Sequence, residues 1–421
     1  MSDIRIFSAS GRGVRKASLS RSAVCLGTLP YFELFLFAFE HKKVVYSAKY
    51  SNQETRLREC GAPSMGKFIL AAALAACAAI EIATAEAAVL VVSKSIQAAV
   101  NEANPGDTIF VPPGTYRETV RVLKDNITIF GPEGAIIDAS GFANGIHVGA
   151  DIFGQGTNGI PVCPATAAKN FTLIGLTIQN AVSNGIFLSG VDTYTLAHGK
   201  YFDNGDYGTY PSCSNNGQII FNFAKGGGDT CIYVGNDVEA SIIGNTATDC
   251  TVGVQVVNSD NVIIRGNVVT GNSTGILAIV DPFNPRTETS DVLIAANRIE
   301  ANNRPNTSTE GDLERIPSGA GILIVGSDNV RIRTNEVTKN NALGVAILQS
   351  PLASQDPRIT DPNPNRDEVR RNVVINNGAH PSPGLPGADL FYDGSGSGNC
   401  FTHNKFGTSV PPKIEAVFPC H

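Results

Sequence analysis

An asparagine phrase that returns at nearly regular intervals constrains the fold of this chain more than any other feature. Copies such as GNVVTGN at 266–272 and TNEVTKN at 334–340 each follow a brief apolar run. Glycines in the flanking segments return with the phrase, since Gly253 and Gly275 are 22 residues apart by subtraction. A period of about 20 to 25 residues, built from β-branched runs and Asn/Gly turns, is typical of stacked β-strands. The sequence therefore predicts an all-β solenoid.

The asparagines are expected to form a column along this solenoid, because stacked asparagine side chains hydrogen-bond one another. Steps of 24, 22, 23 and 22 residues place the first members of the column at Leu176, Lys200, Asn222, Asn245 and Asn267. The later members follow at steps of 30, 38, 37 and 32 residues, at Asn297, Asn335, Asn372 and Asn404. The longer steps predict loops inserted into the later rungs.

Three segments have the composition expected of these loops. Proline, asparagine and aspartate are dense in 281–285, 303–312 and 355–364. Insertions at equivalent points of successive rungs project from one side, and that side is often where ligands bind. We therefore expect one flank of the solenoid to carry all three loops.

A short helix is predicted at the N-terminal end of the repeats. Residues 95–103 place apolar side chains at helical spacing, and the turn 104–107 follows them. The first rung of a solenoid exposes unpaired strand edges and an apolar interior. We expect this helix to cap that end.

The first 87 residues read as a leader rather than as part of the fold. Residues 65–87 combine a basic start with a short apolar stretch, which is typical of an export signal. Residues 1–64 are then a mis-assigned start or an extension, and 88–421 form the solenoid. The sequence allows two processing sites for this signal. One is a lipobox that leaves a lipid on Cys77, and the other is cleavage at the small residues 85–87.

Composition excludes some partners. The net charge is −6 and charged residues make up 17% of the chain, without the basic stripe of a nucleic-acid binder. The apolar stretch near residue 70 is shorter than the ~18 residues of a membrane-spanning helix. Membrane contact is therefore expected only through a lipid on Cys77.

Six cysteines follow Cys77, an even number that suits disulfides in an oxidising compartment. We expect export to the periplasm, the outer envelope or the medium. Cys400 and Cys420 are expected to pair and hold the C-terminal tail, while the other pairings stay open. The sequence contains no CxxC motif and its histidines are scattered, so we predict no metal and no cofactor.

The segments 95–103 and 105–118, together with the GNVVTGN rungs, resemble right-handed parallel β-helix proteins of the pectin-lyase-like type. The stretches 201–211, 229–235 and 389–400 resemble a bacterial family of exported parallel β-helix repeat proteins. The resemblance covers residues 90–421 and implies a right-handed parallel β-helix.

The wider superfamily includes pectate lyases, polygalacturonases and mannuronan epimerases, so the resemblance implies an acidic polysaccharide as substrate. Their catalytic motifs do not carry over. The NTD, DD and GHG set is missing, a WiDH segment is impossible without tryptophan, and DPFN at 281–284 lacks the histidine of DPHD.

One region departs from the asparagine column, because Lys200 takes the place of an asparagine. By the 22-residue step, Tyr207 lies over Asp229, and strands of neighbouring rungs are about 5 Å apart. Tyrosine rings pack on sugars, while lysine and aspartate bind hydroxyls or uronate carboxylates. The predicted substrate-binding residues are Asp203, Asp206, Tyr210, Lys225, Asp229, Tyr233 and Asp237.

A lyase or an epimerase needs a base that removes the C5 proton of a uronate, and Tyr207 and Lys200 are the candidates. The same residues also have a purely structural interpretation. Aspartate is common in turns, and tyrosines on strands mostly pack against neighbouring side chains. The sequence thus supports an exported monomer that binds an acidic polysaccharide. As a lyase or an epimerase, this protein would also process that polysaccharide. The alternative is a non-catalytic envelope scaffold that docks a protein partner.

Overall fold

The structure, a computed structural model, describes residues 87–151, 154–156, 159–308, 312–381 and 384–421. All of them belong to one compact unit, Ile82–His421. The predicted extension 1–64, the signal 65–87 apart from Ala87, and Cys77 lie outside the described residues and stay predictions. Within the described residues, no helix is both long enough and apolar enough to cross a membrane.

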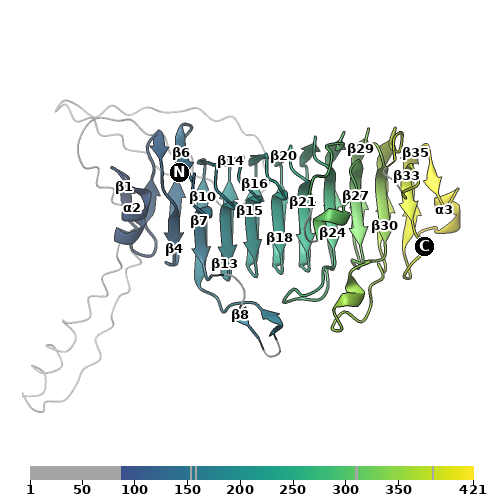
Figure 1. Cartoon of the computed structure of the whole chain (residues 1–421), viewed down its shortest axis with the longest axis horizontal. Helices are drawn as coiled ribbons and strands as arrows, with labels where there is room; N and C mark the ends of the chain where they lie inside the picture. Colours follow the sequence, from purple (N-terminus) through teal and green to yellow (C-terminus); the bar gives the residue numbers. More distant parts are fainter. Residues whose placement is uncertain (1–86, 152–153, 157–158, 309–311, 382–383) are drawn as a thin grey trace, which may run out of the picture. The chain divides into compact units, whose positions relative to one another are not determined.

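The described chain winds through three parallel sheets, A, B and C, and visits them in the order A, B, C in each rung. Sheet A has 12 strands, and sheets B and C have 11 each. Successive strands of every sheet are hydrogen-bonded neighbours, so each rung lies directly on the one before it. The predicted all-β parallel β-helix solenoid is confirmed (Figure 1).

The strands of sheet A are β1 Val89–Val91, β2 Thr108–Phe110, β5 Thr128–Phe130, β10 Ala168–Ile174, β13 Val191–Ala197, β16 Asn215–Ile220, β19 Val238–Ile243, β22 Asp260–Arg265, β25 Leu293–Ala295, β28 Arg331–Arg333, β31 Glu368–Arg370 and β34 Cys400–Thr402. Those of sheet B are β3 Gly114–Tyr116, β6 Ala135–Asp138, β11 Thr177–Gln179, β14 Lys200–Phe202, β17 Phe223–Lys225, β20 Thr246–Thr248, β23 Val268–Thr270, β26 Arg298–Glu300, β29 Glu336–Thr338, β32 Val373–Ile375 and β35 Lys405–Phe406.

The strands of sheet C are β4 Val120–Val122, β7 Asn144–Gly149, β12 Asn184–Ser189, β15 Tyr207–Ser212, β18 Thr230–Gly235, β21 Val252–Val257, β24 Thr274–Ile279, β27 Ala320–Val325, β30 Leu343–Leu348, β33 Ala388–Tyr392 and β36 Ser409–Val410. A separate hairpin joins β8 Gly154–Gln155 to β9 Pro161–Val162. The helices are α2 Ile96–Glu102, α3 Ile414–Val417, and the 3-10 turns η2 Asp312–Arg315 and η3 Ala353–Gln355.

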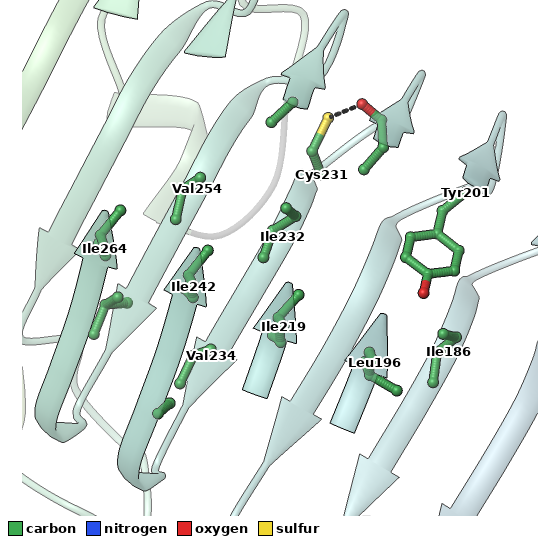
Figure 2. Close-up of a cluster of buried hydrophobic side chains, with 14 of the residues drawn as sticks. Ile186, Leu196, Tyr201, Ile219, Cys231, Ile232, Val234, Ile242, Val254 and Ile264 are labelled. Atoms are coloured by element: carbon green, nitrogen blue, oxygen red, sulfur yellow. Dashed lines mark hydrogen bonds between the residues drawn. The ribbon is translucent and has the colours of Figure 1, made fainter. Parts of the chain in front are cut away.

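Columns of aliphatic side chains fill the interior of the coil. In sheet A the column Leu196, Ile219, Ile242 and Ile264 consists of successive register partners that are fully buried. Figure 2 shows this column beside Ile232 and the other inward side chains of sheet C. β-Branched residues suit such flat, fully buried strands. The short apolar runs of the sequence are therefore the walls of one continuous core.

The predicted asparagine ladder is present from Asn222 to Asn404. Asn245 Nδ2 donates to Asn267 Oδ1 at 3.0 Å, and Asn267 Nδ2 donates to Asn297 Oδ1 at 2.9 Å. The same contact continues through Asn335 and on to Asn404. Because each amide also bonds to backbone groups of adjacent rungs, the ladder satisfies polar groups that the turn between sheets A and B would otherwise bury.

A second ladder, which the sequence analysis did not recognise, runs along the turn between sheets B and C. It uses the last asparagine of each repeated phrase: Asn272 Nδ2 donates to Asn302 Oδ1 at 2.9 Å, and Asn302 Nδ2 donates to Asn340 Oδ1 at 3.2 Å. Asn340 continues it to Asn377 at 2.9 Å. The two asparagines of each phrase, five residues apart, therefore lie just before and just after a sheet B strand.

The predicted register is wrong by one residue at Lys200. Thr177 pairs with Lys200, and Lys200 pairs with Phe223, so Leu176 and Asn222 align with Gly199. Gly199 N donates to Asn222 Oδ1 at 2.8 Å, and the hydroxyl of Tyr201 donates to the same oxygen at 3.1 Å. A glycine and an inward tyrosine thus take the place of an asparagine, and Lys200 points away from the column.

Both ends of the stack are capped. At the N-terminal end, α2 buries Ile96, Ala99 and Val100, as predicted for residues 95–103. Its first turn is held by Glu118, whose Oε1 accepts from the Ile96 amide at 2.7 Å. At the other end, Glu415 Oε1 accepts from Asn404 Nδ2 at 2.9 Å and so terminates the first ladder. Figure 1 shows α2 and α3 at opposite ends of the sheets.

The three predicted loops do not leave the coil at equivalent points. Residues 281–285 and 355–364 follow sheet C strands, whereas 303–312 precede a sheet C strand. The hairpin β8–β9 also follows a sheet C strand, and Figure 1 shows it projecting from the lower edge of that sheet. The insertions therefore border sheet C on two edges rather than project from one side.

Three disulfides cross-link the described chain: Cys163–Cys213, Cys231–Cys250 and Cys400–Cys420. The last is the pair expected from the sequence, and it joins β34 to the C-terminal tail. Cys231 and Cys250 lie in the core, whereas Cys163 belongs to the segment that follows β9. Three disulfides indicate folding in an oxidising compartment, which is consistent with export.

A single ladder position should carry measurable stability. We predict that Asn267→Ala lowers the free energy of unfolding by about 2 to 4 kcal/mol, because it leaves three buried polar partners unsatisfied. Those partners are the backbone amide of Asn245, the Nδ2 group of Asn245 and the Ile242 carbonyl. The measurement is urea unfolding followed by circular dichroism.

The matched control is Asn101→Ala, at an exposed position of α2. It should change the free energy of unfolding by less than about 0.5 kcal/mol. Equal losses in the two variants would contradict a special contribution of the ladder.

Candidate functional site

A cluster of aromatic rings occupies the outer face of sheet C. Tyr210 stacks on Tyr207, with ring centroids 4.4 Å apart, and on Phe187 at 5.4 Å. Tyr233 lies 4.7 Å from Tyr210 and 5.2 Å from Tyr207. Tyr233 is 7% exposed, while Tyr207 and Tyr210 are half-buried. We call Tyr207, Tyr210 and Tyr233 the tyrosine cluster.

One carboxylate is bound to this cluster. The Tyr207 hydroxyl donates to Asp229 Oδ2 at 2.6 Å. The Thr230 hydroxyl lies 2.7 Å from Asp229 Oδ1 and 2.5 Å from Gln255 Oε1. The predicted contact between Tyr207 and Asp229 therefore exists, although the strand register places Thr230 rather than Asp229 opposite Tyr207.

The environment of Tyr207 and Tyr210 raises the pKa of both hydroxyls, which keeps them protonated. Burial, and then the nearby Asp229 carboxylate, raise the pKa of Tyr207 well above its usual value. The same two causes raise the pKa of Tyr210 to about 12. A phenol with a raised pKa donates a hydrogen bond and is a poor proton acceptor at neutral pH. Tyr207 is therefore protonated at neutral pH and is available as a hydrogen-bond donor, but it is unsuited to the predicted role of base.

The two predicted lysines do not join the tyrosine cluster. Lys200 and Lys225 lie on sheet B, in β14 and β17. Lys200 Nζ is 3.0 Å from Glu133 Oε1, and Lys225 Nζ is 3.4 Å from Asp249 Oδ2. Both ion pairs are largely exposed, so each contributes little to stability. The predicted pair of catalytic residues, Tyr207 and Lys200, is thus divided between two sheets.

The predicted aspartates separate into surface and interior groups. Asp203 and Asp206 are exposed in the turn that leads into β15, and Asp206 accepts a hydrogen bond from the Ser183 hydroxyl. These two carboxylates border the same end of sheet C as Asp229. Asp237, in contrast, is fully buried beyond the other end of β18.

Asp237 belongs to the structural wall and not to the surface patch. Its Oδ1 accepts from the Ser214 amide at 2.6 Å, and its Oδ2 accepts from the Tyr194 hydroxyl at 3.0 Å. Burial raises the pKa of Asp237 to about 8. The assignment of Asp237 to substrate binding is wrong, because its carboxylate faces the interior and is 0% exposed.

An inserted loop covers the outer face of sheet C in the rungs that follow the tyrosine cluster. Leu313 and Ile316, from the insertion that contains η2, pack on the outward Leu277 and Leu323 of β24 and β27. Sheet C is therefore covered at those later rungs. Of the two strands that carry the tyrosines, β15 leaves Tyr207 and Tyr210 partly exposed, whereas every residue of β18 is buried.

Two further members of this aromatic surface were not predicted from the sequence. Phe187 aligns with Tyr210 in the sheet, and His147 aligns with Phe187, with ring centroids 4.6 Å apart. Phe187, Tyr210 and Tyr233 follow at steps of 23 residues by subtraction. A search for aromatic residues at the repeat length would have found this column.

His147 ends the column beside Arg121, to which it is hydrogen-bonded, and its Nε2 lies 2.8 Å from the Ala150 carbonyl oxygen. Burial is the main cause that lowers the pKa of His147, and the Arg121 charge adds to it. No group of three or more metal-ligating side chains occurs within the described ranges.

Comparisons with known proteins agree with this architecture. Residues 158–284 and 232–351 match a family described as a right handed beta helix region. The A-module of the mannuronan C-5 epimerase AlgE4 from Azotobacter vinelandii aligns with a TM-score of 0.50 at 16% identity, over 74% of this chain and 83% of that one. DFA-IIIase from Arthrobacter chlorophenolicus A6 aligns with a TM-score of 0.51 at 13% identity, over 78% and 87%. A search of curated proteins found no match. At these identities the likeness concerns the fold.

The buried Asp237 should make stability depend on pH. A carboxyl whose folded pKa is raised from 3.8 to about 8 keeps its proton in the folded state across that window and loses it on unfolding. Stability from this group is therefore lost as the pH rises from about 4 to about 8, by at most about 1.4 kcal/mol per pH unit. We predict that Asp237→Asn reduces this slope.

The measurement is the melting temperature of both proteins at several pH values in that window. The advantage of Asp237→Asn over the wild type should grow as the pH rises. Glu133→Gln removes a carboxylate that is 89% exposed and should leave the slope unchanged. Parallel curves for Asp237→Asn and the wild type would contradict a proton held by the folded state.

Proposed function

We propose that this chain, a right-handed parallel β-helix of the pectin-lyase-like type, binds a polysaccharide on the outer face of sheet C. The tyrosine cluster with its bound Asp229 is the observation that carries the proposal. One protein of similar fold is by name an epimerase of mannuronan, which is itself a polysaccharide. That name supports the class of ligand proposed here.

The chemistry of the cluster suits a sugar ring. The half-buried Tyr207 and Tyr210 offer apolar ring area to sugar C–H groups and hydroxyls to sugar oxygens. Asp206 and Asp229 supply acceptors for sugar hydroxyls at the same end of the sheet. Loops beside sheet C restrict the direction from which a chain can approach.

Acidic polysaccharides are the ligand class that we propose from the resemblance to pectin-lyase-like proteins. Among the predicted cations, Lys225 is the one that borders this face, since it precedes the turn into β18. Because Asp203, Asp206 and Asp229 stand near that turn, contact with a uronate carboxylate would depend on Lys225 and on ordered solvent.

Lyase or epimerase chemistry is the finer part of the proposal. Asp229 would accept the C5 proton, and Tyr207, which lies beside it, would donate its proton to the oxygen that departs from C4 on the same face of the sugar. This assignment reverses the predicted role of Tyr207, because its raised pKa keeps the hydroxyl protonated at neutral pH and so unable to act as the base. Lys200, on sheet B, takes no part in it.

A non-catalytic envelope scaffold is the second candidate. The separation of Lys200 from Tyr207 favours it, because the pair that the sequence offered for catalysis does not assemble. A scaffold would use the same solenoid as a rigid docking surface for a protein partner.

Removing one ring should weaken retention of carbohydrate. We predict that Tyr210→Ala lowers the affinity for uronate polymers about tenfold in affinity electrophoresis, because the ring lies at the centre of the cluster. Phe221→Ala removes a 55% exposed ring at the turn between sheets A and B and serves as the control. If both variants are retarded like the wild type, the cluster is packing only.

A second test separates binding from chemistry. The double change Tyr207→Phe with Asp229→Asn keeps the shape of the pair but removes its proton donor and its carboxylate. We expect it to abolish any unsaturated or epimerised product while the melting temperature stays nearly unaltered. If the folded wild type binds these polymers but forms no product, the protein binds polysaccharide without catalysis. If the wild type neither binds the polymers nor forms product, the scaffold function is favoured.

A further inference from the structure

Four charged side chains form a square on the outer face of sheet A, far along the chain from the tyrosine cluster. Arg331 and Arg333 lie on β28, and Glu368 and Arg370 lie on β31. The register pairs Arg331 with Glu368 and Arg333 with Arg370. Three guanidinium groups and one carboxylate leave a local charge of +2 in a chain whose net charge is −6. We call these four residues the arginine square.

The carboxylate inside the square does not satisfy the arginines. Glu368 forms an ion pair with Arg333, and its Oε1 lies 3.6 Å from Arg370 Nη1. The side chain of Arg331 has no hydrogen bond or ion pair to any residue that the structure describes. The Nε atoms of all three arginines are shielded from solvent and lack an acceptor in the described chain. The guanidinium of Arg331, which has no acceptor in the described chain and lines an open groove, indicates a place for an anion.

A groove leads to this square. It runs over the outer face of sheet A with a volume of about 500 Å³, and Arg331 stands at its end. Gln218 and Ser241 line it at the earlier rungs, and Ile263 and Leu293 line it next to Arg331. These residues come from β16, β19, β22, β25 and β28, five adjacent strands of sheet A. At about 4.8 Å per strand the groove is about 20 Å long.

The lining decides which ligand fits. The backbone groups of interior sheet strands are already paired, so an added peptide strand has no edge to bind. Glu239 and Asp291 also line the groove and would repel a uniformly charged polyanion. Amide, hydroxyl and aliphatic side chains next to a guanidinium fork suit neutral sugar units followed by one carboxylate.

We propose that this groove is a second saccharide site, which binds a chain carrying a carboxylate. The carboxylate is held by Arg331, and the preceding sugar units lie over Ile263 and Leu293. Because sheets A and C are different walls of the coil, this site does not depend on the tyrosine cluster.

The test uses a trisaccharide of two neutral sugar units followed by one uronate, and the neutral methyl ester of the same trisaccharide, with binding measured by isothermal titration calorimetry. Arg331→Gln should weaken binding of the acidic trimer at least tenfold and leave binding of the ester unchanged. Since the Arg331 side chain has no partner in the described chain, this change should not alter the melting temperature. Arg298→Gln, which removes an arginine paired with Glu300 on sheet B, is the matched control and should bind like the wild type.

Tyr210→Ala in the same titration distinguishes the two sites. This variant should keep the part of the trimer's affinity that depends on Arg331, whether or not the proposed site on sheet C exists. Equal affinity of Arg331→Gln and the wild type for the acidic trimer would overturn the second site. Inorganic phosphate that binds as tightly as the trimer, with the same loss in Arg331→Gln, would overturn its saccharide character.

Discussion

The hydrogen bond from one buried asparagine amide to the next is the interaction on which the rest of this structure depends. Each bond requires the backbone to return to the same place one rung later, since a displacement of one residue would leave two amides unpaired in the core. Two such ladders, through Asn267 and Asn272, hold both ends of the sheet B strands. Loops can lengthen between ladder positions without disturbing the coil, and the insertions beside sheet C do so.

Ladders of this kind need ends that satisfy the last amide. Glu415 accepts from Asn404, and Asp389 Oδ1 accepts from Asn377 Nδ2 at 3.0 Å. Each carboxylate replaces the carbonyl oxygen that another asparagine would have supplied. The C-terminal segment is thus part of the hydrogen-bonding pattern, and the Cys400–Cys420 disulfide keeps that segment on the last rung.

Much of the fold was predictable because the residue types of the repeat, at this spacing, are compatible with few other structures. Asparagine and glycine at fixed steps, between β-branched runs, leave little besides a stacked coil. The candidate site was less predictable, because counting places a residue within a rung only to about one position. The shift from Lys200 to Gly199 moved a predicted catalytic residue out of the asparagine column and onto β14, and Asp237 proved to point inward.

The sequence alone determined the coil, its cap over residues 95–103, and the contact between Tyr207 and Asp229, because these follow from periodicity and local spacing. Only the tertiary structure decided which wall each side chain faces. That choice depends on the exact register of three strands per rung, where one residue exchanges interior for surface. It brought Phe187 and His147 to the tyrosine cluster, separated Lys200 from it, and placed three arginines around Glu368.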